Sequence, residues 1–177
     1  MKNNIFTNQK RGFTLIELLV VIGIIGILST VVLASLSSAR TKTQIIRTKM
    51  ELSQIVKAII IAQGETGNYL KDITGSACSN CSGGRTAGVD YKNTLDTDSF
   101  YIRWSASISN IENATNGLMV GVSNIKRDPW GSPYGLDENE GEGGGCSYDV
   151  LRSYGPDGLF STSDDVLSST IPHIKCP

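Results

Sequence analysis

The chain has 177 residues, with 40% hydrophobic and 19% charged side chains and a net charge of −1. This length suits one domain with its own core, and the balanced composition excludes a disordered chain and a nucleic-acid binder. The charge is unevenly distributed, because residues 1–12 carry Lys2, Lys10 and Arg11 without an acid, and the remainder is net −4. This asymmetry is typical of a chain held in the cytoplasm at its N-terminus and exported behind it.

An apolar segment covers residues 13–36, where Glu17 is the only charged side chain. As a helix, this segment would span roughly 36 Å, which is enough to cross a hydrocarbon core of about 30 Å. A plain N-terminal anchor fits this length, whereas the apolar region of a secretory signal peptide usually runs about 7 to 15 residues. A buried helix of a soluble protein is disfavoured because the segment has no polar stripe.

Glu17 separates these alternatives. An acid in the hydrocarbon costs about 2.5–3.5 kcal/mol on insertion scales, and neither an anchor nor a signal peptide gains from it. A cation would offset this cost, and a cut just before Phe13 in a neighbouring copy would supply one as a new α-amine. Glu17 lies four residues after Phe13, about one helical turn, so a staggered neighbour can place its terminus opposite the acid.

The stretch Gly12-Phe13-Thr14-Leu15-Ile16-Glu17-Leu18, behind Lys10 and Arg11, resembles the class III signal of type IV pilins and type II secretion pseudopilins. The resemblance implies that prepilin peptidase removes residues 1–12 by cutting after Gly12, and that Phe13 is then N-methylated. It also implies assembly into a helical filament, with Glu17 pairing with a neighbour's N-terminus. Family members often carry a proline where this chain has Ala34.

The same resemblance sets the expected partners and location. The partners are further copies of the chain, minor pilins or pseudopilins, the prepilin peptidase, an inner-membrane assembly platform and, before assembly, the lipid bilayer. No nucleic-acid contact is expected. The chain would cross the inner membrane once with its head outside the cytoplasm, and then enter a secretion pseudopilus or a surface pilus. The alternative is an extracytoplasmic binding or enzymatic domain on an uncleaved anchor.

Helical periodicity continues through residues 37–64, which predicts an amphipathic extension of the same helix. Gln63-Gly64 and Thr66-Gly67-Asn68 indicate its end. The apolar positions that recur at three- and four-residue steps are Ile45, Met50, Leu52, Ile55, Val56, Ile59 and Ile60.

Residues 65–177 are predicted to form a small globular head. The head begins with a loop at 67–99, and alternation at residues 99–109 predicts a strand with Phe100, Ile102, Trp104, Ala106 and Ile108 on one face. Residues 118–122, after Asn116-Gly117, and 148–151 are further strand candidates. Without a βαβ pattern, the predicted fold class is α+β, with an antiparallel sheet packed on the long helix.

Residues 128–134, Asp-Pro-Trp-Gly-Ser-Pro-Tyr, resemble a segment of the major, G-type pseudopilins of type II secretion. Two prolines fix φ in this stretch, and Trp130 and Tyr134 can fasten it to the core. An ordinary loop anchored by a tryptophan would play the same role.

Residues 153–168 contain a stretch that resembles the calcium loop of the same proteins. Calcium takes six to eight hard oxygen ligands, and three carboxylates converge if the chain reverses between Asp157 and Asp164. The resemblance implies side-chain ligands from Asp157, Asp164 and Asp165, with carbonyls near Tyr154, Leu159 and Ser168 completing the shell. A solvated acidic turn is the alternative.

Four cysteines allow three disulfide pairings in an exported domain. By the resemblance to pilins we favour Cys146–Cys176, which would tie the C-terminal tail to the body and leave Cys78–Cys81 as a local bridge. Alternatively, Cys78 and Cys81 supply half of a zinc site completed by Cys146, Cys176 or His173. Nothing in the sequence indicates catalysis, so the chain is not expected to be an enzyme.

Overall fold

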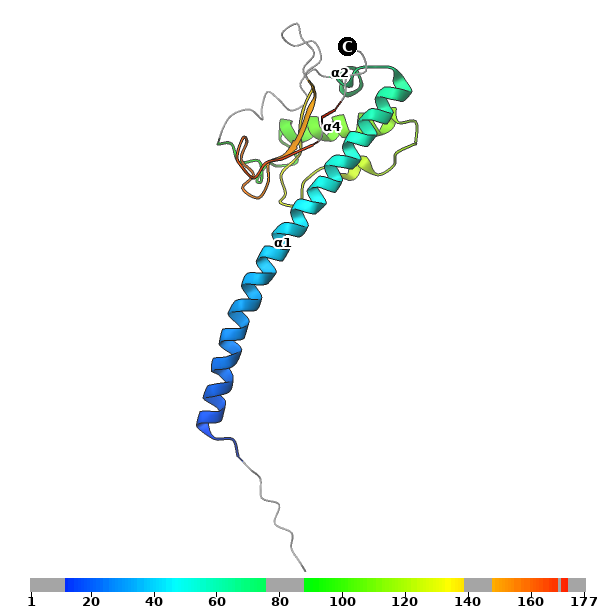
Figure 1. Ribbon diagram of the computed structural model, residues 1–177. Helices are drawn as coiled ribbons and strands as arrows, with labels where there is room; N and C mark the ends of the chain where they lie inside the picture. The colour runs from blue at the N-terminus through cyan, green and yellow to red at the C-terminus, as the bar shows by residue number, and fades with distance from the viewer. Residues whose placement is uncertain (1–11, 76–87, 139–147, 169, 172–177) are drawn as a thin grey trace, which may run out of the picture. The chain divides into compact units, whose positions relative to one another are not determined.

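The structure is a computed structural model that describes residues 12–75, 88–138, 148–168 and 170–171. It divides into two compact units, residues 1–41 and 42–177. Figure 1 shows the long first helix followed by short helices and a small sheet, which confirms the α+β fold class. In chain order the elements are α1 (Leu15–Thr66), α2 (Leu70–Thr74), α4 (Ser99–Ala114), the 3₁₀ turn η1 (Val122–Asn124), β1 (Gly135–Asp137), β2 (Val150–Ser153) and β3 (Val166–Leu167).

Helix α1 is the one helix in the described residues that is long and apolar enough to cross a membrane. It is helical without interruption through Gly23 and Gly26. It ends two residues beyond the predicted Gly64, where the Gly67 amide donates to the Gln63 carbonyl at 2.8 Å. Gly67 has a φ of +67°, the left-handed conformation that commonly closes a helix.

In the second unit, α1 buries one stripe of side chains. Its periodicity was predicted, but the predicted stripe included Met50 and Ile60, and both are exposed. Because successive residues are offset by about 100° around the axis, Met50 lies on the side of the helix opposite Leu52, Ile55 and Ile59, whereas Ile60 lies at the edge of the buried stripe. The apolar side of α1 is therefore narrower than predicted, and a second, partly apolar side faces away from the core.

The strand predicted at residues 99–109 is wrong, because this segment is helix α4. Asp98 caps the helix by accepting from the Phe100 amide at 2.7 Å. The predicted strand would place Ile102 and Trp104 on the same buried face. In the structure Ile102 is 52% exposed, whereas Trp104 is fully buried, so the two side chains do not share a face. The side chains that α4 buries follow the helical spacing instead: Phe100, Trp104, Ser107, Ile108 and Ile111.

The strand predicted at residues 118–122 is also absent. Asn116, Gly117 and Gly121 all have positive φ values, and left-handed residues turn a chain rather than extend it. The Asn-Gly pair, taken as a hairpin signal, instead directs the chain away from the end of α4. The loop predicted at 67–99 contains the short helix α2, which sequence analysis missed.

The sheet has three antiparallel strands in the order β1-β2-β3. Leu136 pairs with Leu151, and Arg152 pairs with both Gly135 and Leu167. Strand β2 overlaps the predicted strand 148–151, but β1 and β3 were not predicted, since three and two residues are too few to show alternation. Gly135 is required in β1 because an added Cβ would lie 2.3 Å from the Tyr154 hydroxyl.

The main core lies between α1, α4 and the sheet. Trp104 and Tyr134 meet at its centre with ring centroids 5.8 Å apart. A smaller aromatic cluster joins Tyr91, Phe100 and Tyr154, with the Tyr91 and Tyr154 rings stacked at 4.3 Å. This cluster adjoins the predicted calcium loop, since Tyr154 is the second residue of that loop.

Candidate functional site

The N-terminal site is formed by the first turn of α1. The Thr14 amide and hydroxyl each donate to Glu17 Oε2 at 2.8 Å, and the Glu17 amide donates back to the Thr14 hydroxyl at 3.3 Å. This is a capping box, in which the first and fourth residues of a helix start satisfy each other's free backbone groups. Sequence analysis missed it, although Thr14-x-x-Glu17 is its usual signature.

The side chains around Glu17 are exposed and apolar. Phe13 is 90% exposed, and a shallow hollow of about 370 Å³ lies between Phe13, Glu17 and three aliphatic neighbours, Ile16, Val20 and Val21. Further along, the hydroxyls of Ser29, Thr30 and Ser35 donate to carbonyls of the preceding turn at 2.7–3.0 Å. These hydroxyls are therefore satisfied within the helix, as hydrocarbon surroundings require.

The second site is the loop that contains the three aspartates predicted to bind calcium. The structure brings all three together around the hydroxyl of Thr162. Its Oγ1 lies 2.6 Å from Asp164 Oδ1, 3.3 Å from Asp157 Oδ1 and 3.3 Å from Asp165 Oδ1. The Leu159 carbonyl oxygen is also 3.3 Å away. Thr162 was missed by sequence analysis, which considered only carboxylates and carbonyls.

Glycine closes this loop. Gly155 has a φ of +64°, and a Cβ at this position would lie 2.3 Å from the Asp164 carbonyl oxygen. The two ends of the loop therefore touch where only hydrogen fits. The Asp157 amide then donates to Asp164 Oδ2, and the Ser161 amide to Asp165 Oδ2, each at 3.0 Å. The predicted reversal between Asp157 and Asp164 is present.

The aspartates of the loop differ in their electrostatic surroundings. Burial works against ionisation of Asp164, but hydrogen bonds from Thr162 and the Asp157 amide outweigh it and lower the pKa. Burial raises the pKa of Asp165, and the Ser161 amide and Arg152 only partly offset this effect. Arg152 Nη1 lies 3.9 Å from Asp165 Oδ2, so one cation already faces the edge of the loop.

The loop gathers oxygen donors, but the structure does not arrange them as a metal site. All the oxygens around Thr162 are hard donors, the type that calcium binds at about 2.3–2.6 Å. Among the residues that the structure describes, however, no three acidic, histidine or cysteine side chains are arranged to hold a metal ion together. The carboxylates are spaced by their hydrogen bonds to Thr162 and to the backbone.

The three carbonyls predicted as ligands lie in different positions. The Leu159 carbonyl belongs to the group around Thr162. The Tyr154 carbonyl accepts from the Gly158 amide at 3.2 Å, and Ser168 pairs with β2 through its amide, 2.9 Å from the Leu151 carbonyl. Only Leu159 is therefore shown together with the three carboxylates.

The segment 128–134 is connected to this loop by a chain of hydrogen bonds. The buried Asp128 accepts from the Trp130 and Ser132 amides at 3.0 Å and from the Ser153 hydroxyl at 2.6 Å. Ser153 accepts in turn from the Gly155 amide at 3.2 Å. Burial raises the pKa of Asp128, although these hydrogen bonds oppose the shift. As predicted, Tyr134 anchors the segment in the core, but Trp130 is only partly buried and does not belong to the core cluster. The link through Asp128 was not predicted.

The remaining predicted residues lie outside the described part of the chain. They are the basic residues Lys2, Lys10 and Arg11, the four cysteines and His173. The two disulfides and the alternative zinc site therefore stay predictions.

The sequence of the chain is similar to that of known proteins. The family described as the prokaryotic N-terminal methylation motif matches residues 7–33. The chain is 28% identical to the type II secretion system core protein G of Escherichia coli (strain K12), over 90% of this chain and 91% of that protein. Proteins of the same name from Klebsiella pneumoniae and Dickeya chrysanthemi are 26% and 28% identical, over 92% and 89% of this chain and 96% and 85% of theirs. No solved structure gives a significant match.

A methylation motif, a long exposed apolar helix and a small antiparallel head are the features of a pilin-type protein, and they support the resemblance to type IV pilins and type II secretion pseudopilins. Among these proteins it is similar to core protein G over about nine-tenths of its length.

Proposed function

We propose that the chain is a structural subunit of a type II secretion pseudopilus, made as a prepilin and assembled through its N-terminal helix. The observation that carries this proposal is the methylation motif at residues 7–33, placed at the start of a helix whose apolar side chains are exposed on all sides. A helix of this type is stable in lipid or against identical helices. No enzymatic role is proposed, because the similar proteins are secretion-system components.

The finer steps belong to the same proposal. Prepilin peptidase cuts after Gly12, Phe13 is N-methylated, and the subunit waits in the inner membrane with its head outside the cytoplasm. An assembly platform and minor pseudopilins then act on it. In the filament, the carboxylate of Glu17 pairs with the Phe13 amine of a neighbouring copy. The apolar hollow beside Glu17 supports this step, because it offers the neighbour's terminus a surface of low polarity.

Replacing Gly12 with Glu is expected to block processing. Gly12 is exposed, and no atom lies within 4 Å of an added Cβ, so the substitution should leave the fold unchanged and act on the peptidase alone. Gel mobility of the membrane-extracted protein would show a chain that retains residues 1–12. Gly12→Ala, which adds one methyl group, is the matched control and should still be cut. If Gly12→Glu migrates with processed wild type, cleavage does not occur at this position.

Calcium binding by residues 153–168 is the second part of the proposal. The support is the gathering of Asp157, Asp164 and Asp165 around one hydroxyl, closed by Gly155. In the calcium-bound form the carboxylates would turn from Thr162 to the ion, with the Leu159 carbonyl as a further ligand. The ion would offset the repulsion between three negative charges and hold β3 against β2.

Calcium is expected to raise the thermal midpoint of residues 42–177. Extracellular calcium modules bind at about 10⁻⁴–10⁻³ M, so 1 mM calcium would stabilise the folded state by about 0.4–1.4 kcal/mol. Asp164→Ala should remove this difference between calcium and chelator. Asp72→Ala, which removes an exposed acid from α2, should retain it. Equal wild-type midpoints in the two buffers, with no heat of calcium binding, would reduce the loop to a hydrogen-bonded acidic turn.

A further inference from the structure

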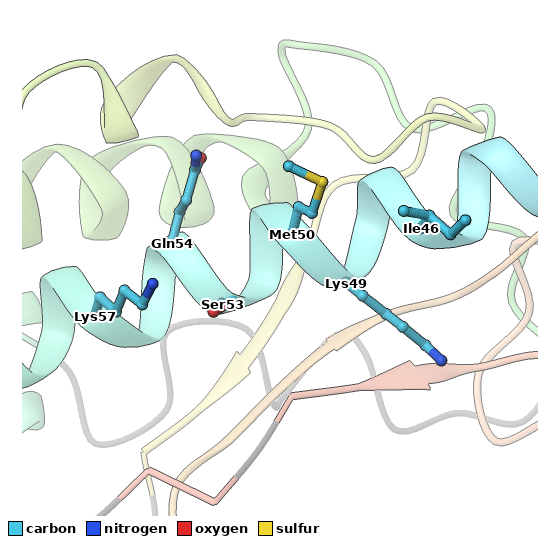
Figure 2. Close-up of a pocket in the computed structure, with 6 residues that line it drawn as sticks. All are labelled: Ile46, Lys49, Met50, Ser53, Gln54 and Lys57. Carbon is cyan, nitrogen blue, oxygen red and sulfur yellow. The ribbon is translucent and has the colours of Figure 1, made fainter.

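The side of α1 that faces away from the core carries a continuous surface that nothing in its own head covers. Figure 2 shows its six side chains along three turns of the helix, around a shallow hollow of about 360 Å³. We call this surface the outer strip; it consists of Ile46, Lys49, Met50, Ser53, Gln54 and Lys57.

The outer strip is partly apolar. Ile46 and Met50 are each 60% exposed. They lie one helical turn apart, so their side chains form one apolar patch. Opposite them, Leu52, Ile55 and Ile59 are buried against the head. The exposed pair therefore cannot reach the core of its own chain.

The outer strip is also basic. Lys49 and Lys57 have no ion-pair partner among the described residues. Between Lys42 and Gly64 the sequence contains one acid, Glu51, and Arg47 holds it at 2.8 Å. Lys49 thus lies beside the apolar patch, and Lys57 lies two turns beyond Met50 along the helix.

A surface of opposite character lies on the head, where the chain enters α4. It is a hollow of about 530 Å³ that we call the acidic groove, lined by Val89, Asp90, Tyr91, Asn93, Thr94, Leu95, Asp98, Ser99, Phe100 and Arg103. Leu95 is 70% exposed in it. Asp90 and Asp98 accept hydrogen bonds from backbone amides, but Arg103 is the only cation among the lining residues. Asp90 also bridges to Leu159, which joins the groove to the aspartate loop.

We propose that the outer strip of one copy docks into the acidic groove of the next copy. Each surface combines exposed aliphatic side chains with charged ones. The outer strip carries two lysines, whereas the acidic groove carries two aspartates and one arginine, so the net charges of the two surfaces are opposite. Because the strip faces away from its own head, the partner must be a second molecule. Two different surfaces that meet in this way form a heterologous contact, which repeats into an open helical filament rather than closing into a dimer. This inference rests on the proposed filament assembly and names a contact between heads in addition to the N-terminal one.

Charge reversal in the full-length chain tests this contact. Lys49→Glu with Lys57→Glu places acids against the acidic groove and should lower filament yield about tenfold, because like charges that meet across an interface are strongly unfavourable. Leu95→Lys, at an exposed groove position, should lower the yield when introduced alone. When all three substitutions are combined, the lysine introduced at position 95 can pair with a glutamate introduced in the strip, and assembly should recover.

The controls separate this contact from the assembly proposal. Lys71→Glu in α2 lies outside both surfaces. It changes the net charge of the chain by the same amount as Lys57→Glu, and this variant should form filaments normally. Membrane level and protease resistance of the head verify that every variant folds. Wild-type filament yield from Lys49→Glu/Lys57→Glu, or a loss that Leu95→Lys does not restore, would overturn the docking. Failure of the wild-type chain itself to form filaments would instead contradict the proposed function.

Discussion

Glu17→Val is expected to leave the chain in the membrane but to reduce filament yield by more than about tenfold. The substitution makes the segment more apolar, so insertion should not suffer. It also removes the carboxylate proposed to meet a neighbour's Phe13 amine, and losing one partner of a desolvated charge pair costs roughly 2–5 kcal/mol. The measurement is sheared or extracted filament protein compared with the membrane pool.

Glu17→Gln is the informative companion variant, because Glu17 has a second role in the structure. Its carboxylate completes a capping box with Thr14, and glutamine can serve at this capping position. Gln therefore retains the helix start but removes the charge. If the intermolecular pair is the reason for Glu17, both variants should fail to assemble. Normal assembly of Glu17→Gln would show that helix capping, rather than charge, is what the position supplies.

Trp104→Ala is expected to destabilise the head by about 3–5 kcal/mol, the usual cost of removing a large buried aromatic side chain. Trp104 is fully buried between α1, α4 and the sheet, and its ring packs against Tyr134. A loss of this size is a large part of the about 5–15 kcal/mol that holds a typical domain together. Denaturant unfolding of residues 42–177 measures it.

Ile102→Ala is the matched control, and it also distinguishes the helix from the predicted strand. In α4, Ile102 points away from the core and is half exposed, so its truncation should cost little. On a strand it would share the buried face with Trp104 and cost about 2–5 kcal/mol. Comparable losses from the two variants would therefore contradict the helical register of α4.

The error at residues 99–109 has a simple physical origin. Phe100, Trp104 and Ile108 are four residues apart, and this spacing satisfies both the strand period of two and the helical period of 3.6. The positions that decide are Ile102, which a strand would bury, and Ile111, which the helix buries. The strand prediction rests on an alternation of apolar and polar residues that includes Ile102. Asp98, which is a typical capping residue, and the apolar Ile111 favour the helix instead.

The N-terminal site was predictable because its information is local. The proposed cleavage, methylation and membrane insertion depend on consecutive residues around Gly12, Phe13 and Glu17, and the family comparison matches the same stretch. Even there, the capping role of Thr14 was overlooked.

The aspartate loop was predictable only in part. Its carboxylates and glycines are visible in the sequence, but Thr162 is an ordinary residue until the chain closes around it. The link from Asp128 through Ser153 to Gly155 joins residues far apart in the sequence. Contacts of this type depend on the register of β2, which no local pattern fixes.

The most direct test of the central claim is the intact mass of the full chain extracted from membranes of a host that has a prepilin peptidase. The filament account predicts a polypeptide that begins at Phe13 and carries one additional methyl group on its α-amine. It also predicts that the Gly12→Glu chain keeps residues 1–12 and lacks the methyl group. A wild-type mass that still includes residues 1–12 would contradict the account and identify residues 13–36 as a permanent anchor for the head.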